Sequence, residues 1–149
     1  MSEYQYFEFQ AVDWSLGEKQ IEELRKYSGR AAITSTSFVN EYHYGDFKGD
    51  SLKWMQKYFD GFFYFANWGT RELFLRFPKA AIESKLIEQY CSGEVFDLVE
   101  TDSHSIVCFS VDEIDSDQLW ESDEGTLSDF LKLRSAVLEN EDYRVFFKF

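Results

Sequence analysis

The residues that could do chemistry in this sequence are few and far apart. His43 and His104 are the two histidines, and Cys91 and Cys108 are the two cysteines. A zinc site needs several such ligands at short spacing, and no pair here has that spacing. Two cysteines cannot form a disulfide framework, so both are interpreted as small buried residues in a reducing compartment. The sequence therefore predicts no metal site and no cofactor.

Acidic residues between positions 112 and 125 raise the question of a calcium site. A helix-loop-helix calcium loop needs oxygen ligands at positions 1, 3, 5 and 12 and glycine at position 6. Starting the loop at Asp112 puts Ile114 at position 3, and starting it at Asp115 puts Trp120 at position 6. Neither register works, so the segment 112–125 is predicted to be an acidic surface loop.

Catalytic groups are equally hard to assign. General acid–base chemistry needs a carboxyl group whose apolar surroundings shift its pKa. Glu8, within an aromatic stretch, is the candidate by context, although a solvent-facing or edge position is the simpler interpretation. No G-x-S-x-G nucleophile motif and no glycine-rich phosphate loop occur in the sequence. We assign no catalytic residue and lean against an enzyme.

The segment from Phe38 to Phe77 has the most unusual composition. It contains fourteen aromatic residues with five Lys or Arg residues among them. The phenylalanines are expected in the core, whereas Tyr and Trp carry a polar group that favours the surface. Tyr, Trp and Arg dominate protein-binding hot spots, and aromatics beside cations also stack on single-stranded bases. The predicted binding residues are Tyr42, His43, Tyr44, Lys48, Trp54, Trp68, Arg71 and Arg76.

The elements that must position these residues follow from periodicity. Alternation predicts a strand over residues 4–12, and Ser15 is expected to cap a helix over about 17–28. One long or broken strand covers 31–44, and Asp50 or Ser51 caps a second helix. Residues 62–66 and 72–77 form a hairpin around the turn 67–70.

The second half of the chain continues the same mixture. A helix is expected from Pro78 to about Cys91, then a hairpin of 95–99 with 106–111, then a helix over about 127–138. The order β-α-β-α-β-β-α-β-β-α indicates one α+β domain over residues 1–149, with an antiparallel or mixed sheet and helices packed on a face. The apolar end, 143–149, is either a terminal strand or a sign that the chain is the N-terminal part of a longer protein.

The net charge of −13 comes from one part of the chain. Between Leu86 and Leu131 there are thirteen acidic residues and no Lys or Arg, while the rest holds fifteen of each sign. This acidic face disfavours nucleic acid and anionic membranes as partners there. The longest apolar run is far shorter than the roughly 20 residues of a membrane span, and the N-terminus lacks a signal-peptide pattern. We expect a cytoplasmic protein with no membrane partner.

Four strings between residues 4 and 100 are distinctive. They are YQYFEF from Tyr4, TSFVN from Thr36, YGDFKGD from Tyr44 and ANWGT from Ala66. Through them the chain resembles a family of uncharacterised bacterial proteins with no assigned activity. The resemblance implies a bacterial cytoplasmic setting and favours a longer protein, and it transfers no catalytic residue.

Three hypotheses of function follow. The leading one is a non-enzymatic protein-interaction module that presents an aromatic surface and a separate acidic face to a protein partner. The second is binding of single-stranded nucleic acid through Phe38–Phe77. The third is an enzyme whose site assembles from scattered residues, which a deep pocket holding Glu8, His43 or Asp46 beside a cation would support.

Overall fold

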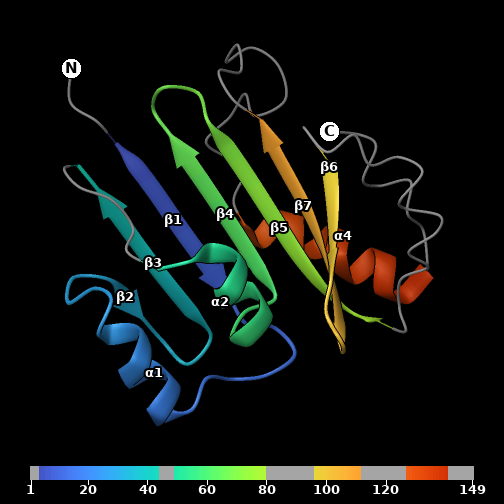
Figure 1. The fold of residues 1–149 in the computed structure, drawn as a ribbon, viewed down its shortest axis with the longest axis horizontal. Coiled ribbons are helices and arrows are strands. Elements are labelled where there is room, and N and C mark those ends of the chain that lie inside the picture. The colour runs from blue at the N-terminus through green and yellow to red at the C-terminus, as the bar shows by residue number, and fades with distance from the viewer. Residues whose placement is uncertain (1–3, 44–48, 80–95, 112–126, 141–149) are drawn as a thin grey trace.

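A seven-stranded antiparallel sheet forms the centre of the protein, as the computed structural model shows (Figure 1). The structure describes residues 4–43, 49–79, 96–111 and 127–140. The strand order is β2-β3-β1-β4-β5-β7-β6. The strands are β1 (Gln5–Gln10), β2 (Ala32–Ile33), β3 (Ser37–Tyr42), β4 (Gly61–Ala66), β5 (Arg71–Pro78), β6 (Phe96–Glu100) and β7 (His104–Val111). The helices described are α1 (Glu18–Arg25), α2 (Ser51–Lys57) and α4 (Leu127–Asn140).

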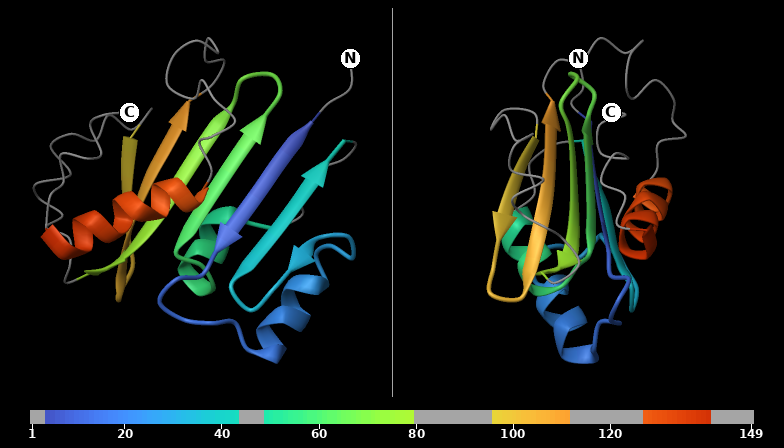
Figure 2. Two further views of the ribbon diagram at one scale, coloured as in Figure 1. Left: turned by 180° about the vertical axis from the view of Figure 1, so that it is seen from behind. Right: turned by 90° about the vertical axis from the view of Figure 1, so that its right-hand side faces the viewer.

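The predicted α+β class is confirmed, and the sheet is antiparallel at each pairing between described strands. The helices divide between its two faces, with α1 and α2 on one side and α4 on the other (Figure 2). Alternation along the strands explains this division, because successive side chains point to opposite faces. Phe62 of β4 therefore packs with the α2 side, while its neighbour Phe63 packs with α4.

Two apolar cores result, one on each face of the sheet. The larger one joins aromatic residues of β1, β3 and β4 to the buried side of α1 and α2, and the smaller one joins β5 and β7 to α4. Burial of rings on this scale is the main apolar contribution to folding. The largest fully buried apolar side chains are Phe9, Phe38, Phe59, Phe62, Phe77, Leu24, Met55, Leu73 and Leu75.

One glycine sets the distance between α4 and the sheet. A Cβ at Gly61 would lie 2.9 Å from Cδ2 of Leu131 and 3.2 Å from Cδ1 of Leu127. A side chain at the first residue of β4 would therefore require the ends of these leucine side chains to move. Figure 2 shows the resulting arrangement from behind, with α4 lying across β4 and β5.

Most predicted elements are confirmed, with differences at their ends. Asp50 caps α2, since its side chain accepts from the backbone N–H of Lys53 at 3.1 Å. The prediction that Ser15 caps α1 is wrong: Gly17 is the N-cap, and its N–H donates to Oε1 of Gln20 at 2.8 Å. Leu16 is buried, and its N–H donates to the carbonyl of Ser35, so it belongs to the connection before the helix.

Of the two forms predicted for 31–44, one long strand or a broken one, the structure has the broken one, as an antiparallel pair. Ala32 pairs with Val39 and Ile33 with Phe38, so β2 folds back on β3. Both other hairpins are confirmed, and Gly69 adopts a positive φ of 111° in the turn between β4 and β5. The prediction that a helix begins at Pro78 is wrong at that residue, because Pro78 ends β5 and pairs with His104 of β7. The rest of that helix beyond Lys79, the acidic loop 112–125 and the end 143–149 lie outside the described residues.

Within the described part of the chain, no helix has both the length and the apolar character needed to cross a membrane.

Candidate functional site

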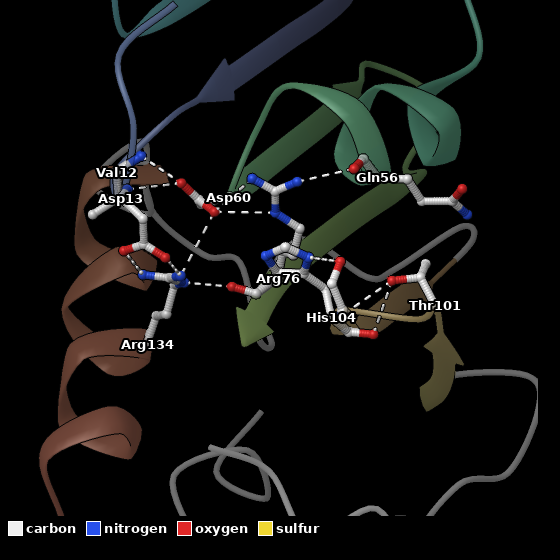
Figure 3. A network of polar contacts seen from close by, with 9 residues as sticks. Val12, Asp13, Gln56, Asp60, Arg76, Thr101, His104 and Arg134 are labelled. Carbon is white, nitrogen blue, oxygen red and sulfur yellow. Dashed lines mark hydrogen bonds and ion pairs between the residues drawn. The ribbon is translucent and has the colours of Figure 1, made fainter. Parts of the chain in front are cut away.

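Four charged side chains form a cluster at the end of the sheet where β1 finishes and β4 begins (Figure 3). They are Asp13, Asp60, Arg76 and Arg134. Asp60 has no exposed surface, and Arg76 and Arg134 are 5% and 1% exposed. Two carboxylates face two guanidinium groups, so the charges cancel. Such burial is tolerated only where charges are paired and hydrogen-bonded.

Asp60 is the centre of this cluster. Its Oδ1 accepts from Nε and Nη2 of Arg76 at 3.1 and 2.9 Å, and its Oδ2 accepts from the backbone N–H groups of Val12 and Asp13 at 2.6 and 2.9 Å. Burial by itself would raise the pKa of Asp60. The N–H groups of Val12 and Asp13, followed by the charges of Arg76 and Arg134, outweigh burial, so the pKa of Asp60 is lowered.

The two arginines extend the cluster to both helical layers. Arg76 donates through Nη1 to the carbonyl of Gln56 in α2 at 3.0 Å. Arg134 of α4 donates through Nε to the carbonyl of Arg76 at 2.6 Å and through Nη2 to Oδ2 of Asp13 at 2.7 Å. The cluster thus ties α2, α4 and the chain after β1 to one point of the sheet.

This geometry is suited to holding structure rather than to catalysis. The lowered pKa keeps Asp60 ionised at neutral pH, and both of its oxygens already accept N–H donors. A general base needs an oxygen within reach of a substrate proton, which a carboxylate without exposed surface does not offer. Among the described residues, no group of three His, Cys, Asp or Glu side chains could hold a metal ion.

His104 borders the cluster at the start of β7 (Figure 3). Its Nδ1 lies 2.7 Å from Oγ of Ser103, and its backbone N–H donates to Oγ1 of Thr101 at 3.0 Å. Desolvation, followed by the positive charge of Arg76, lowers the pKa of His104. The imidazole is therefore neutral at pH 7 and helps to fix the turn between β6 and β7.

The buried cluster fixes the backbone of an exposed loop that was not among the predicted binding residues. Residues 12–14, which we name the anchor loop, carry Val12 at 48% and Trp14 at 74% exposure. The backbone around it is fixed, because Asp60 accepts two of its N–H groups and because Ala11 and Leu16 donate to the carbonyls of Thr36 and Ser35. The only signal for Trp14 in the sequence is its place in a turn between a predicted strand and a predicted helix. There, neither the alternation of a strand nor the spacing of a helix assigns the residue to a core.

Several predicted binding residues lie at the opposite end of the sheet, where β1 begins. Trp68, in the turn between β4 and β5, is 48% exposed, and its Nε1 donates to Oγ1 of Thr70 at 3.0 Å. His43 is exposed beyond β3, with its ring 5.4 Å from that of Tyr4. Tyr42 is half-buried against Phe7, with ring centroids 5.3 Å apart.

Arg71 belongs to the same end of the sheet but is already engaged. Its guanidinium lies 3.8 Å above the ring of Phe65, and Nη1 donates to the carbonyls of Ala66 and Thr70. A guanidinium that covers a ring and bonds two carbonyls is less available for stacking on a base.

Two other predicted binding residues lie inside the protein. Trp54 is 4% exposed and packs its ring against Phe9 and Phe38 at 5.1 and 4.9 Å. Arg76 is buried against Asp60. Both side chains are almost entirely enclosed, because the wide apolar arc of α2 and the charge of Asp60 draw them inward. Tyr44 and Lys48 lie outside the described residues.

Glu8 also has an unexpected position. The simpler interpretation, a solvent-facing or edge residue, is wrong: Glu8 lies on β1 between β3 and β4 and is 9% exposed. Its carboxylate accepts from the hydroxyl of Tyr6 at 2.9 Å and from Nε2 of Gln10. Burial and then this bond to Glu8 raise the pKa of Tyr6. The three side chains form a polar row along one strand, in which the neighbours on β1 satisfy the carboxylate.

In comparisons with known proteins, no family model, no curated protein and no solved structure matches this chain.

Proposed function

We propose that this chain is a non-enzymatic protein-interaction module that docks through the anchor loop. The observation that carries the proposal is the 74% exposure of Trp14 beside a backbone held by a carboxylate with no exposed surface. Trp is enriched in binding hot spots because its ring brings a large apolar area into a partner's pocket. A backbone that is already fixed loses little conformational entropy on binding, so more of the contact energy appears as affinity.

Val12 adds a second apolar contact beside Trp14. Exposed apolar residues scattered singly are ordinary on protein surfaces, whereas two on one fixed loop form a small anchor. The size of this anchor fits a partner pocket that takes one indole ring and a neighbouring aliphatic group.

An acidic residue near the anchor loop indicates the rim of that pocket. Glu18, four residues after Trp14, is exposed, whereas the carboxylate of Asp13 is already paired with Arg134. An apolar pocket with basic residues around it would complement this surface. Complementary charge of this kind mainly accelerates association, and salt weakens the effect.

The test compares Trp14→Ala with Trp68→Ala. Both tryptophans are exposed, but they lie at opposite ends of the sheet, so Trp68→Ala is the matched control. Each variant and the unaltered chain would be used for affinity capture, and the dissociation constant of any recovered partner would be measured. We expect Trp14→Ala to weaken binding by about 30-fold or more, the loss of a hot spot, and Trp68→Ala to have little effect.

Equal recovery of the partner with Trp14→Ala would contradict docking through the anchor loop. A measured turnover that survives in Trp14→Ala would instead favour an enzyme. Loss of binding in Trp68→Ala alone would instead place the interface at the end of the sheet where β1 begins, among the binding residues predicted from the segment Phe38–Phe77.

A further inference from the structure

A pocket of about 320 Å³ lies beside α2. This helix is on the face of the sheet away from α4 (Figure 2). Its lining residues are Tyr27, Gly49, Asp50, Lys53, Trp54, Lys57 and Tyr58. Tyr27 follows α1, and the other residues belong to α2 or lie directly beside it. The pocket is therefore separate from the anchor loop, the buried charge cluster and the row around Glu8.

Helical spacing gives this pocket one cationic and one aromatic side. Lys53 and Lys57 lie four residues apart on α2, and Trp54 and Tyr58 lie four residues apart one position further along. Residues at this spacing form neighbouring rows on a helix surface. Tyr27 closes the aromatic side, with its ring 5.2 Å from that of Trp54 at an interplanar angle of 75°.

The two cations of this pocket differ in the ion pairs that they make with described residues. Nζ of Lys57 lies 3.7 Å from Oε2 of Glu23 and 5.1 Å from the ring centroid of Tyr58. Asp50 accepts from the backbone N–H of Lys53 as a helix cap. No ion pair joins the ammonium group of Lys53 to another residue in the described ranges.

Glu23 is held in place by a second contact. The hydroxyl of Tyr58 donates to Oε2 of Glu23, the oxygen that also faces Lys57. This arrangement neutralises one end of the cationic row and fixes the ring of Tyr58 as a wall. Lys53 at the other end remains the attractive point for a negative group.

We propose that this pocket binds a small planar aromatic carboxylate. The carboxylate pairs with Lys53, and the ring lies against Tyr27 and the edges that the largely buried Trp54 and Tyr58 present to the pocket. Ligand pockets commonly measure roughly 300–1,000 Å³, so this one takes one or two fused rings rather than a nucleotide. Tyr27 is 44% exposed, which leaves its ring surface available for the ligand.

The test titrates the full chain with 1-naphthoate and with its neutral counterpart 1-naphthamide. The readout is the indole N–H signal of Trp54 in ¹H–¹⁵N correlation spectra, told apart from those of the other three tryptophans, Trp14, Trp68 and Trp120, by the Trp→Phe variant of each. We expect naphthoate to shift the Trp54 signal with a dissociation constant of about 1 mM or below. Naphthamide should bind about three- to fivefold more weakly, because it lacks the charge that pairs with Lys53.

Two variants and a control complete the experiment. Lys53→Gln should weaken the binding of naphthoate by about three- to fivefold and leave the affinity for naphthamide unchanged. Tyr27→Ala should weaken the binding of both ligands. Lys26→Gln, an exposed cation outside the pocket lining, should change neither. No shift of the Trp54 signal up to about 10 mM, equal binding of the two ligands, or an unchanged affinity in Lys53→Gln would each overturn the proposal.

Discussion

The carboxylate of Asp60 receives the guanidinium of Arg76 on one oxygen, at 2.9 and 3.1 Å, almost entirely out of contact with solvent. The pair sits between the two helical layers, since Arg76 donates to α2 and its carbonyl accepts from Arg134 of α4. A buried ion pair stabilises a protein little more than a pair of apolar residues of similar size, because the cost of desolvation opposes the attraction between the charges. In this fold the pair instead fixes the position at which the anchor loop and both helical layers meet the sheet.

Removing the charge of Asp60 should destabilise the protein strongly. Asp60→Asn leaves two buried guanidinium groups without their shared carboxylate, a change that typically costs about 3–5 kcal/mol. Urea unfolding followed by circular dichroism measures the change in the free energy of unfolding. The exposed Asp102→Asn is the control and should change that free energy by less than about 0.5 kcal/mol. Equal stability of the two variants would show that the cluster does not hold the fold.

The contribution of Asp60 should also depend on pH. Folding lowers the pKa of this carboxyl from its ordinary value of 3.8, so on acidification the unfolded chain takes up a proton before the folded one does. The stabilisation is therefore complete above about pH 5 and is lost as the pH falls through the folded-state pKa. The difference in unfolding free energy between the unaltered chain and Asp60→Asn, measured from about pH 2 to 7, should be flat above about pH 5 and shrink below it. A difference that grows on acidification would contradict the assigned direction.

His104 gives a second pH-dependent signal. Desolvation and the charge of Arg76 disfavour its imidazolium, so its pKa in the folded protein lies below 6.5. As the pH falls below 6.5 the unfolded chain is protonated at this residue first, so His104 contributes stability that is lost as the pH falls through its folded-state pKa. The Cε1–H resonance, followed by ¹H NMR and assigned with His104→Gln, should titrate with a midpoint below 6.5. A midpoint above that value would mean that the surroundings stabilise the imidazolium instead.

Gly61 should not tolerate a methyl group. In Gly61→Ala the new Cβ would lie 2.9 Å from Cδ2 of Leu131 and 3.2 Å from Cδ1 of Leu127, so these packed side chains, or α4 with them, must move. Overpacking of this kind typically costs about 1–3 kcal/mol. Gly29→Ala is the control, because nothing lies within 4 Å of its added Cβ, and its stability should be unchanged or slightly raised. Thermal unfolding measures the stability of both variants, and an unchanged stability of Gly61→Ala would contradict the close approach of α4.

Truncation of two tryptophans should change the stability of the protein to very different extents. Trp54→Ala removes a ring that is 4% exposed and should cost about 3–5 kcal/mol, as large core truncations do. Trp14→Ala removes a ring that is 74% exposed and should change stability by less than about 0.5 kcal/mol. Chemical denaturation of the two variants provides the comparison. A large destabilisation by Trp14→Ala would show that the indole packs within the fold and is not an anchor for a partner.

The elements of this fold could largely be predicted from local patterns. Alternation and turn residues identified the hairpins of β4 with β5 and of β6 with β7, and helical spacing identified α1, α2 and α4. The cap of α1 could not be predicted, because Ser15 and Gly17 both precede a helical pattern. The choice between them depends on Leu16, which a contact with the distant Ser35 draws into the core.

The candidate site was much harder to predict. Composition drew attention to the segment Phe38–Phe77, where Trp54 and Arg76 proved to be buried. It gave no weight to Trp14, a single ring in a polar turn. The buried charge cluster draws Asp13, Asp60, Arg76 and Arg134 from four separate parts of the chain, and no spacing in the sequence relates them.

By itself, the sequence determined the class of the fold, because alternation, helical periodicity and turn chemistry act between residues close together in the chain. Only the tertiary structure decided which side chains are exposed. Burial depends on which face of a strand an element covers and on which distant charge finds a partner. Asp60 makes this difference plain: in the chain it is one acidic residue among twenty-eight Asp and Glu, and in the fold it is the point at which two helical layers and the anchor loop are joined.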